Sequence, residues 1–259
     1  MCELFGVNST EAIYCNDLLR EFFGHGVDNP HGWGMAFFYD NDNAVSLEKE
    51  PVSSVKSVYL KNRLTEEIMA DKLIAHIRKA SKGGVEYKNS HPFIRRDDTN
   101  RAWTLAHNGT IFESPELAPY LSRQKGQTDS ERILYYLVDR INAARRAVGR
   151  ELTEKERFSV VDEVVHTVTP ENKVNLLIYD GNLFYVHTNH KDSLHRCLMG
   201  KALLISTKPL DQNDWEKVPM NTLLAYRDGE LAYVGKPHTN EYVEDANKTR
   251  YLYLDYANI

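Results

Sequence analysis

The 259-residue sequence has few cysteines, no long apolar run and no excess of basic residues. Its three cysteines, Cys2, Cys15 and Cys197, are too few and too scattered for a disulfide framework, which favours a reducing compartment. No stretch reaches the roughly 18–20 apolar residues of a membrane span, and the N-terminus lacks the basic-then-apolar pattern of a secretory signal. These absences predict a cytoplasmic protein without a membrane partner.

The charges are balanced along the chain. There are 32 Lys and Arg residues against 37 Asp and Glu residues, a net charge of −5, without a long block of either sign. The basic surface expected of a nucleic-acid-binding protein is therefore missing, and we expect small molecules or proteins as partners. Because 42% of the residues are apolar and no repeat or flexible linker divides the chain, we predict a single domain over residues 2–259.

Short apolar or alternating segments predict strands at 33–39, 73–78, 102–107, 173–179, 183–187, 202–206, 223–226 and 231–234. The sequences Asp180-Gly181-Asn182 and Asp228-Gly229-Glu230 are typical of hairpin turns between neighbouring strands. A short helix is predicted within 52–64. Strands and helices together indicate the α+β class, with two antiparallel sheets and helices outside them.

Two longer helices are predicted in the middle of the chain. Apolar residues recur on one face over 130–148, and Gly149 follows as a typical helix end. The second helix covers 153–168 and starts with Thr153 and Glu156 at the spacing of a capping box.

Cys2 follows Met1 directly, so removal of Met1 would leave a thiol and a free α-amine on one residue. An α-amine with a pKa of about 7.7–8.0 is well matched to accept the proton of a thiol with a pKa of about 8.5. This is the N-terminal-nucleophile arrangement, in which the chain's own terminus acts as general base. Taken alone, a cysteine directly after Met1 is weak support for this arrangement, so the assignment depends on the other motifs of the chain.

Five short polar motifs occur in order along the first half of the chain. Each is weak alone: Asn108-Gly109 resembles an ordinary hairpin turn, Asp129 a helix N-cap, and Arg78 half of a surface ion pair. The motifs are Met1-Cys2-Glu3-Leu4-Phe5-Gly6, His31-Gly32-Trp33-Gly34, His76-Ile77-Arg78-Lys79-Ala80-Ser81, Ala106-His107-Asn108-Gly109-Thr110-Ile111 and Thr128-Asp129-Ser130-Glu131.

In this order the motifs resemble the class II glutamine amidotransferases, particularly the small stand-alone members that lack a synthase domain. The resemblance spans Cys2 to about Glu131, and Ile205 to Leu210 with Trp215 is similar to the same subgroup. It implies the four-layer α/β/β/α sandwich of the N-terminal-nucleophile hydrolases. It also implies glutaminase-type hydrolysis, in which Cys2 attacks the side-chain amide of glutamine to give a γ-glutamyl thioester and ammonia. No cofactor is implied.

The resemblance also implies roles for individual residues. The side-chain amide of Asn108 and the backbone N–H of Gly109 would stabilise the tetrahedral oxyanion. Arg78 would bind the α-carboxylate of glutamine, Asp129 would bind its α-ammonium, and Ser81 would add a hydrogen bond.

Three histidines lie close to these motifs. We expect His31, His91 and His107 to support the site, with His91 orienting the loop near Asn108, although a papain-like pairing of Cys2 with a histidine stays open. Another cluster, His187, His190, His195 and Cys197, lies within one segment. A structural zinc normally takes paired ligands from two parts of a chain, so we predict no metal.

Two features of the chain leave alternatives open. The family pattern often has a Tyr-Ser-Thr-like stretch where this chain has Lys79-Ala80-Ser81-Lys82, which leaves open how tightly the pocket encloses the substrate.

The predicted domain leaves no room for an ammonia-accepting synthase. The ammonia would then pass to a separate partner protein, or the enzyme is a plain hydrolase of glutamine or a larger γ-glutamyl compound. The competing class is a non-catalytic glutamine or γ-glutamyl sensor, or a regulatory subunit of a partner enzyme.

Overall fold

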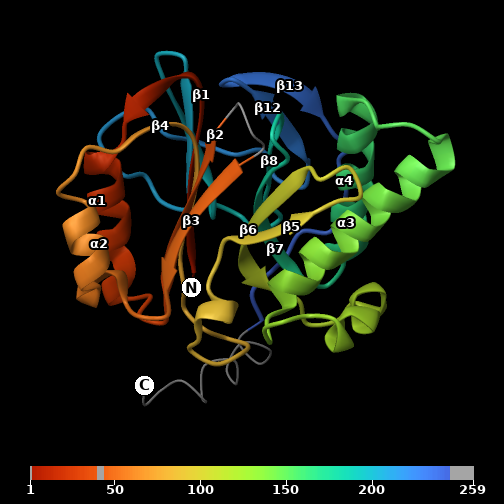
Figure 1. Ribbon diagram of the computed structural model, residues 1–259, viewed down its shortest axis with the longest axis horizontal. Coiled ribbons are helices and arrows are strands. Elements are labelled where there is room, and N and C mark those ends of the chain that lie inside the picture. Colours follow the sequence, from red (N-terminus) through yellow and green to blue (C-terminus); the bar gives the residue numbers. More distant parts are fainter. Residues whose placement is uncertain (1, 40–43, 246–259) are drawn as a thin grey trace.

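Two antiparallel sheets lie face to face at the centre of the molecule, and helices cover both outer faces (Figure 1). The computed structural model describes residues 2–39 and 44–245. The arrangement confirms the predicted α+β class and the four-layer α/β/β/α sandwich.

The first sheet has seven strands, and the N-terminal strand β1 lies inside it, between β10 and β4. Its strands, in the order β11-β9-β10-β1-β4-β2-β3, are β1 (Glu3–Tyr14), β2 (Trp33–Tyr39), β3 (Ala44–Glu50), β4 (Met69–Ile77), β9 (His195–Met199), β10 (Ala202–Ser206) and β11 (Glu216–Lys217). In the register of β1 and β4, Glu3 lies opposite Ile77. Cys2 and Arg78, each one residue beyond this pair, are thereby brought to the same end of the sheet.

The second sheet has six strands. In the order β13-β12-β8-β7-β6-β5 they are β5 (Phe93–Arg96), β6 (Ala102–Thr110), β7 (Lys173–Tyr179), β8 (Phe184–His187), β12 (Leu224–Arg227) and β13 (Glu230–Val234). Both predicted hairpin turns are confirmed, since they join β7 to β8 and β12 to β13. Asp228 and Gly229 have φ values of 52° and 87°, the successive left-handed residues that favour such a turn.

Helices α1 (Asn16–Gly24) and α2 (Val58–Arg63) lie on the side of the seven-stranded sheet, while α3 (Asp129–Val148) and α4 (Glu154–Val168) cover the six-stranded sheet (Figure 1). The two long helices were predicted to within one residue. The helix predicted within 52–64 is shorter than that range, because a 3-10 turn (Ser54–Lys56) comes first and Ser57 then caps α2 by accepting from the N–H of Leu60 at 2.9 Å.

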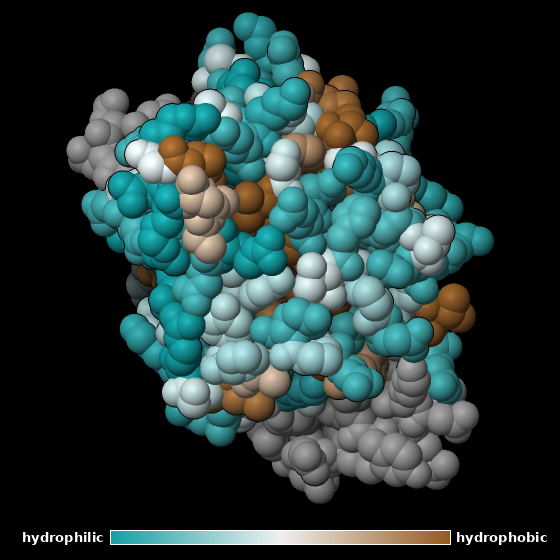
Figure 2. Space-filling view, turned by 90° about the vertical axis from the view of Figure 1, so that its right-hand side faces the viewer, coloured by the Kyte–Doolittle hydropathy of each residue, from teal (hydrophilic) through white to brown (hydrophobic). Residues whose placement is uncertain are grey.

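Three layers of buried apolar side chains hold the sheets and helices together. Leu4 and Phe184 belong to the layer between the sheets, Phe22 packs α1 onto the first sheet, and Leu137 and Val161 pack α3 and α4 onto the second. The outer face of the molecule on the α3 and α4 side is mostly hydrophilic (Figure 2). No helix within residues 2–39 and 44–245 has both the length and the apolar character needed to cross a bilayer.

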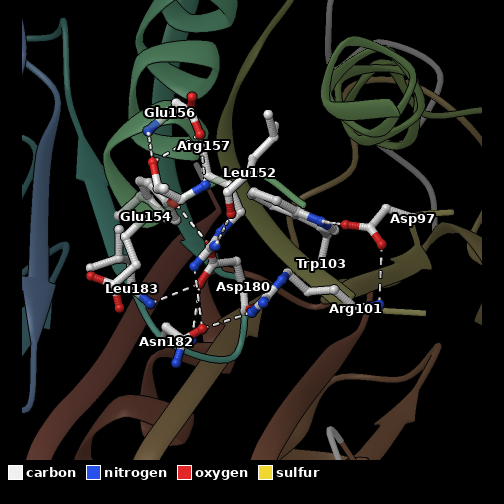
Figure 3. A network of polar contacts seen from close by, with 12 residues as sticks. Asp97, Arg101, Trp103, Leu152, Glu154, Glu156, Arg157, Asp180, Asn182 and Leu183 are labelled. Carbon is white, nitrogen blue, oxygen red and sulfur yellow. Dashed lines mark hydrogen bonds and ion pairs between the residues drawn. The ribbon is translucent and has the colours of Figure 1, made fainter. Parts of the chain in front are cut away.

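A buried ion pair lies where β7 ends and β8 begins (Figure 3). Nε of Arg157 on α4 donates to Oδ2 of Asp180 at 2.7 Å, and both side chains are almost fully buried. Asp180 also accepts from the hydroxyl of Tyr185 at 3.0 Å and from the N–H of Leu183 at 2.7 Å. This network fixes the turn and anchors α4 at the end of the sheet where β6 begins, away from the motif residues at the other end of β6.

Candidate active site

Cys2 stands at the N-terminal end of β1 and is held by the residue that follows Arg78. Its sulfur accepts a hydrogen bond from the backbone N–H of Lys79 at 3.2 Å and lies 3.3 Å from the Lys79 carbonyl oxygen, which can accept the thiol proton. The register of β1 and β4 therefore joins the first motif of the sequence to the third.

The surroundings of Cys2 favour a neutral thiol. Burial raises the pKa of the Cys2 thiol above its ordinary value, whereas the Lys79 N–H and the charge of Arg78 lower it and Asp129 raises it further. A thiol of this kind needs a base to remove its proton before it can act as a nucleophile. The free α-amine predicted for this role depends on the loss of Met1, which lies outside the described residues.

Arg78 is buried, so the alternative of a surface ion pair is wrong for this residue. Its Nη1 donates to the carbonyl of Gly84 at 2.9 Å, and its Nη2 donates to the carbonyls of Lys82 and Gly83 at 2.8 and 2.9 Å. The guanidinium group therefore holds the loop that follows β4. Ser81 is half-buried in the same loop, and its hydroxyl makes no hydrogen bond with a described residue.

Asp129 is the first residue of α3, but the helix cap is its neighbour. The hydroxyl of Thr128 accepts from the N–H of Glu131 at 3.3 Å, so the N-cap interpretation of Asp129 is wrong. The carboxylate of Asp129 accepts instead from the N–H of Ile111 at 2.7 Å and of Ser130 at 2.9 Å. Asp129 thus ties the start of α3 to the end of the Asn108 motif.

Asn108 and Gly109 lie inside β6, which continues to Thr110, three residues beyond the predicted end. The hairpin-turn interpretation of this pair is wrong, because β6 is paired there with β7. A Cβ atom added at Gly109 would lie only 1.9 Å from the carbonyl oxygen of Lys173, so the strands approach too closely for a side chain. The Asn108 side-chain amide has no hydrogen-bond partner among the described residues.

His31 supports the turn after Arg78. Its ring Nδ1 accepts from the N–H of Ala80 at 2.9 Å, and the backbone N–H of His31 donates to the carbonyl of Arg78 at 3.0 Å. Burial, the charge of Arg78 and that of Lys79 lower the pKa of His31, which favours the neutral ring that this acceptor role requires. His31 therefore holds the backbone of residues 78–80, to which the Cys2 sulfur is hydrogen-bonded.

His107 and His91 are fully enclosed. Nε2 of His107 donates to the Lys173 carbonyl at 3.1 Å, which leaves Nδ1 to accept from the Ser130 hydroxyl at 2.9 Å. His91 Nδ1 lies 2.8 Å from Nε2 of His76, and burial lowers the pKa of both rings of this pair well below the ordinary value. The His107 contacts join β6 to β7 and to α3, and the His91 contact joins the segment before β5 to β4 of the other sheet.

Two lysines of the site were missed in the sequence. The ammonium of Lys82 donates to the carbonyl of Ile111 and lies 4.0 Å from Oδ2 of Asp129. Burial lowers the pKa of Lys173 to about 8, against the opposing effect of the Glu244 and Cys2 charges. Lys173 stands at the start of a predicted strand, but only the folded chain shows that it is buried and that the charge of Cys2 acts on it.

The histidine and cysteine cluster at 187–197 is divided between the two sheets, since His187 ends β8 and Cys197 lies in β9. His187 Nε2 pairs with Nε2 of His238 at 3.0 Å, and His195 Nδ1 lies 3.1 Å from the carbonyl of Thr207. Within residues 2–39 and 44–245, no three His, Cys, Asp or Glu side chains converge on a point that could hold a metal ion.

The comparisons with known proteins agree with this geometry. The family model of the class II glutamine amidotransferases matches residues 1–200 of the chain. The chain therefore belongs to the class II glutamine amidotransferase family. A relative with 28% identity is an uncharacterized protein of Methanocaldococcus jannaschii, and the similarity covers 93% of this chain and 73% of that protein.

Solved structures show the same fold. A predicted glutamine amidotransferase from Pseudomonas aeruginosa superposes with a TM-score of 0.60 at 21% identity, covering 90% of this chain and 100% of that one. Glutamine phosphoribosylpyrophosphate amidotransferase from B. subtilis, solved with ADP and GMP, superposes with a TM-score of 0.65 at 17% identity. In that case 89% of this chain matches 48% of the larger one.

Proposed function

We propose that this protein is an amidohydrolase in which Cys2 cleaves the side-chain amide of glutamine or of a related γ-glutamyl compound through a thioester. The observation that carries the proposal is that the Cys2 sulfur accepts a hydrogen bond at 3.2 Å from the N–H of Lys79, directly after the buried Arg78, in a chain that belongs to the class II glutamine amidotransferase family. Arg78 and Asp129 also act electrostatically on this thiol, in opposite directions, and such a pair of charges suits a substrate whose reactive carbonyl is tethered to charged groups.

In the proposed first step, the free α-amine of mature Cys2 takes the thiol proton, and the sulfur attacks the amide carbonyl carbon. The oxyanion accepts hydrogen bonds from the Asn108 side chain and the Gly109 N–H. When the tetrahedral intermediate collapses, the C–N bond breaks, the α-ammonium returns its proton to the leaving nitrogen, and ammonia departs. Water, deprotonated by the same amine, then attacks the thioester and releases the carboxylic acid and the thiol.

Three measurements on one purified sample test this proposal. Mass spectrometry of the N-terminal peptide should show that Met1 has been removed. An electrophilic glutamine analogue should label Cys2, and glutamine should be converted into glutamate and ammonia in equal amounts. Cys2→Ser should abolish ammonia release, whereas Cys197→Ser should keep it, because Cys197 lies in β9 outside the motif residues.

The opposite results would indicate another protein class. Tight binding of glutamine without ammonia release, by a sample that lacks Met1, would support the sensor or regulatory subunit instead. Ammonia release that survives Cys2→Ser would overturn the proposed nucleophile.

A further inference from the structure

The loop at residues 82–84 reaches the group proposed to bind a substrate's α-ammonium. Arg78 fixes the backbone of this loop through three carbonyl oxygens, at 2.8 to 2.9 Å. From that backbone, the side chain of Lys82 extends to the carbonyl of Ile111, and its ammonium lies 4.0 Å from Oδ2 of Asp129. A lysine ammonium therefore faces the same carboxylate that a glutamine α-ammonium would need.

The charges around this position favour one class of substrate. Beside the carboxylate of Asp129, Lys82 already supplies the positive charge that the α-ammonium of glutamine would otherwise bring. The α-carboxylate and α-ammonium of glutamine sum to zero, whereas a γ-carboxamide acid without the α-ammonium carries one negative charge there. Two ammonium groups competing for one buried carboxylate repel each other, and that repulsion discriminates against glutamine.

We propose that Lys82 is a specificity-determining residue whose ammonium occupies the α-ammonium subsite, so that the pocket accepts γ-carboxamide acids that lack a free α-ammonium. This inference rests on the proposed function, since it names the substrate class of the same site. Glutaramate, the five-carbon monoamide without an α-amino group, is the simplest such substrate. N-acylated glutamine belongs to the same class.

The exposure of the Lys82 and Asp129 side chains limits how strongly Lys82 can discriminate between substrates with and without an α-ammonium. The side chain of Asp129 is 7% exposed, whereas that of Lys82 is 32% exposed. A partly exposed lysine can be displaced at moderate cost, so we expect discrimination of about ten-fold, equivalent to about 1.4 kcal/mol.

Matched variants and two substrates test the inference. Initial rates of ammonia release should be measured for glutamine and glutaramate, and the ratio of their kcat/KM values compared. Lys82→Met should shift this ratio about ten-fold toward glutamine, whereas Lys82→Arg should keep it because the charge remains. Lys88→Met is the control, since Lys88 lies in the same connection but its ammonium pairs with Glu86 at the surface, at 3.0 Å.

Binding measurements on a variant that cannot release ammonia distinguish a failure of the Lys82 specificity role from a failure of the proposed hydrolase. In the Cys2→Ala background, calorimetry with both amides should show the same ten-fold change on addition of Lys82→Met. An unchanged ratio with ammonia release intact overturns the specificity role and leaves the proposed hydrolase standing. Failure of wild-type protein to release ammonia from either amide overturns the hydrolase, and the calorimetric ratio then still decides the role of Lys82. Loss of binding of both amides in Lys82→Met, with an unchanged thermal melt, would also overturn the inference.

Discussion

Asn108 and Asn175 lie directly opposite each other on the antiparallel strands β6 and β7, but only one of their side-chain amides is engaged. Asn175 donates to the hydroxyl of Ser193 at 2.9 Å and accepts from the hydroxyl of Thr188 at 2.7 Å. The amide of Asn108 makes no such contact with a described residue. Asn175 therefore stabilises the fold, whereas the amide of Asn108 is left available to a ligand.

This contrast predicts opposite effects for two alanine variants. Asn108→Ala should lower kcat by about 10²–10³-fold because one oxyanion donor is lost. Its thermal melt should change little. Asn175→Ala should instead lower the free energy of unfolding by about 1–3 kcal/mol, because buried partners lose their hydrogen bonds. Urea unfolding and glutamine turnover of both variants check this, and an Asn108→Ala enzyme with full activity would remove Asn108 from the mechanism.

Gly109 should tolerate no side chain. In Gly109→Ala the new Cβ would lie 1.9 Å from a backbone oxygen, that of Lys173, so β6 and β7 would have to separate next to the candidate oxyanion donors. We expect a loss of both activity and stability, the latter by about 1–3 kcal/mol.

Gly149→Ala is a useful comparison. That glycine has a left-handed φ of 70°, but no atom beyond its neighbours in the chain lies within 4 Å of an added Cβ. It should lose about 1 kcal/mol of stability through backbone strain and retain its activity. If Gly109→Ala and Gly149→Ala lost the same activity, the effect of Gly109→Ala could not be ascribed to the close approach of β6 and β7 at the candidate site.

The parts of the fold with a strong local pattern were predictable, and those defined by distant partners were not. Helices α3 and α4 have one apolar face and clear caps, so their predicted bounds differ from the structure by one residue or less. Strand β1 was missed because its first seven residues are buried on both faces and show no alternation. The contact of Lys82 with Ile111 joins residues 29 positions apart in sequence, and no local pattern contains such a contact.

Acid should destabilise the protein through His187. Burial and the charge of His238 lower the pKa of His187 to about 3, while the unfolded chain titrates near about 6.5. The neutral ring therefore contributes its full stability above pH ~6.5, and this contribution is lost as the pH falls toward 3. At about pH 5 the loss from His187 alone should be about 2 kcal/mol.

The variant His187→Asn isolates this contribution. An asparagine amide can still donate toward the Val174 carbonyl, which the Nδ1–H of His187 contacts at 3.0 Å, but it does not titrate. Urea unfolding between about pH 7.5 and about pH 5 should show a shallower loss of stability in this variant than in the wild type. Parallel curves would show that His187 does not govern the acid response.

The buried pair of Arg157 and Asp180 should contribute to the stability of the fold but not to substrate binding. Arg157→Met leaves a carboxylate with no exposed surface unpaired, so we expect the free energy of unfolding to fall by about 3–5 kcal/mol. Arg150→Met is the matched control, because Arg150 lies in the connection just before α4 and pairs with Glu156 of that helix at 2.8 Å in solvent, so its loss should change the melt little. Since the pair lies at the opposite end of β6 from Asn108, the folded Arg157→Met protein should keep the wild-type KM at low temperature. A raised KM in that variant would mean that the two ends of the sheet are coupled.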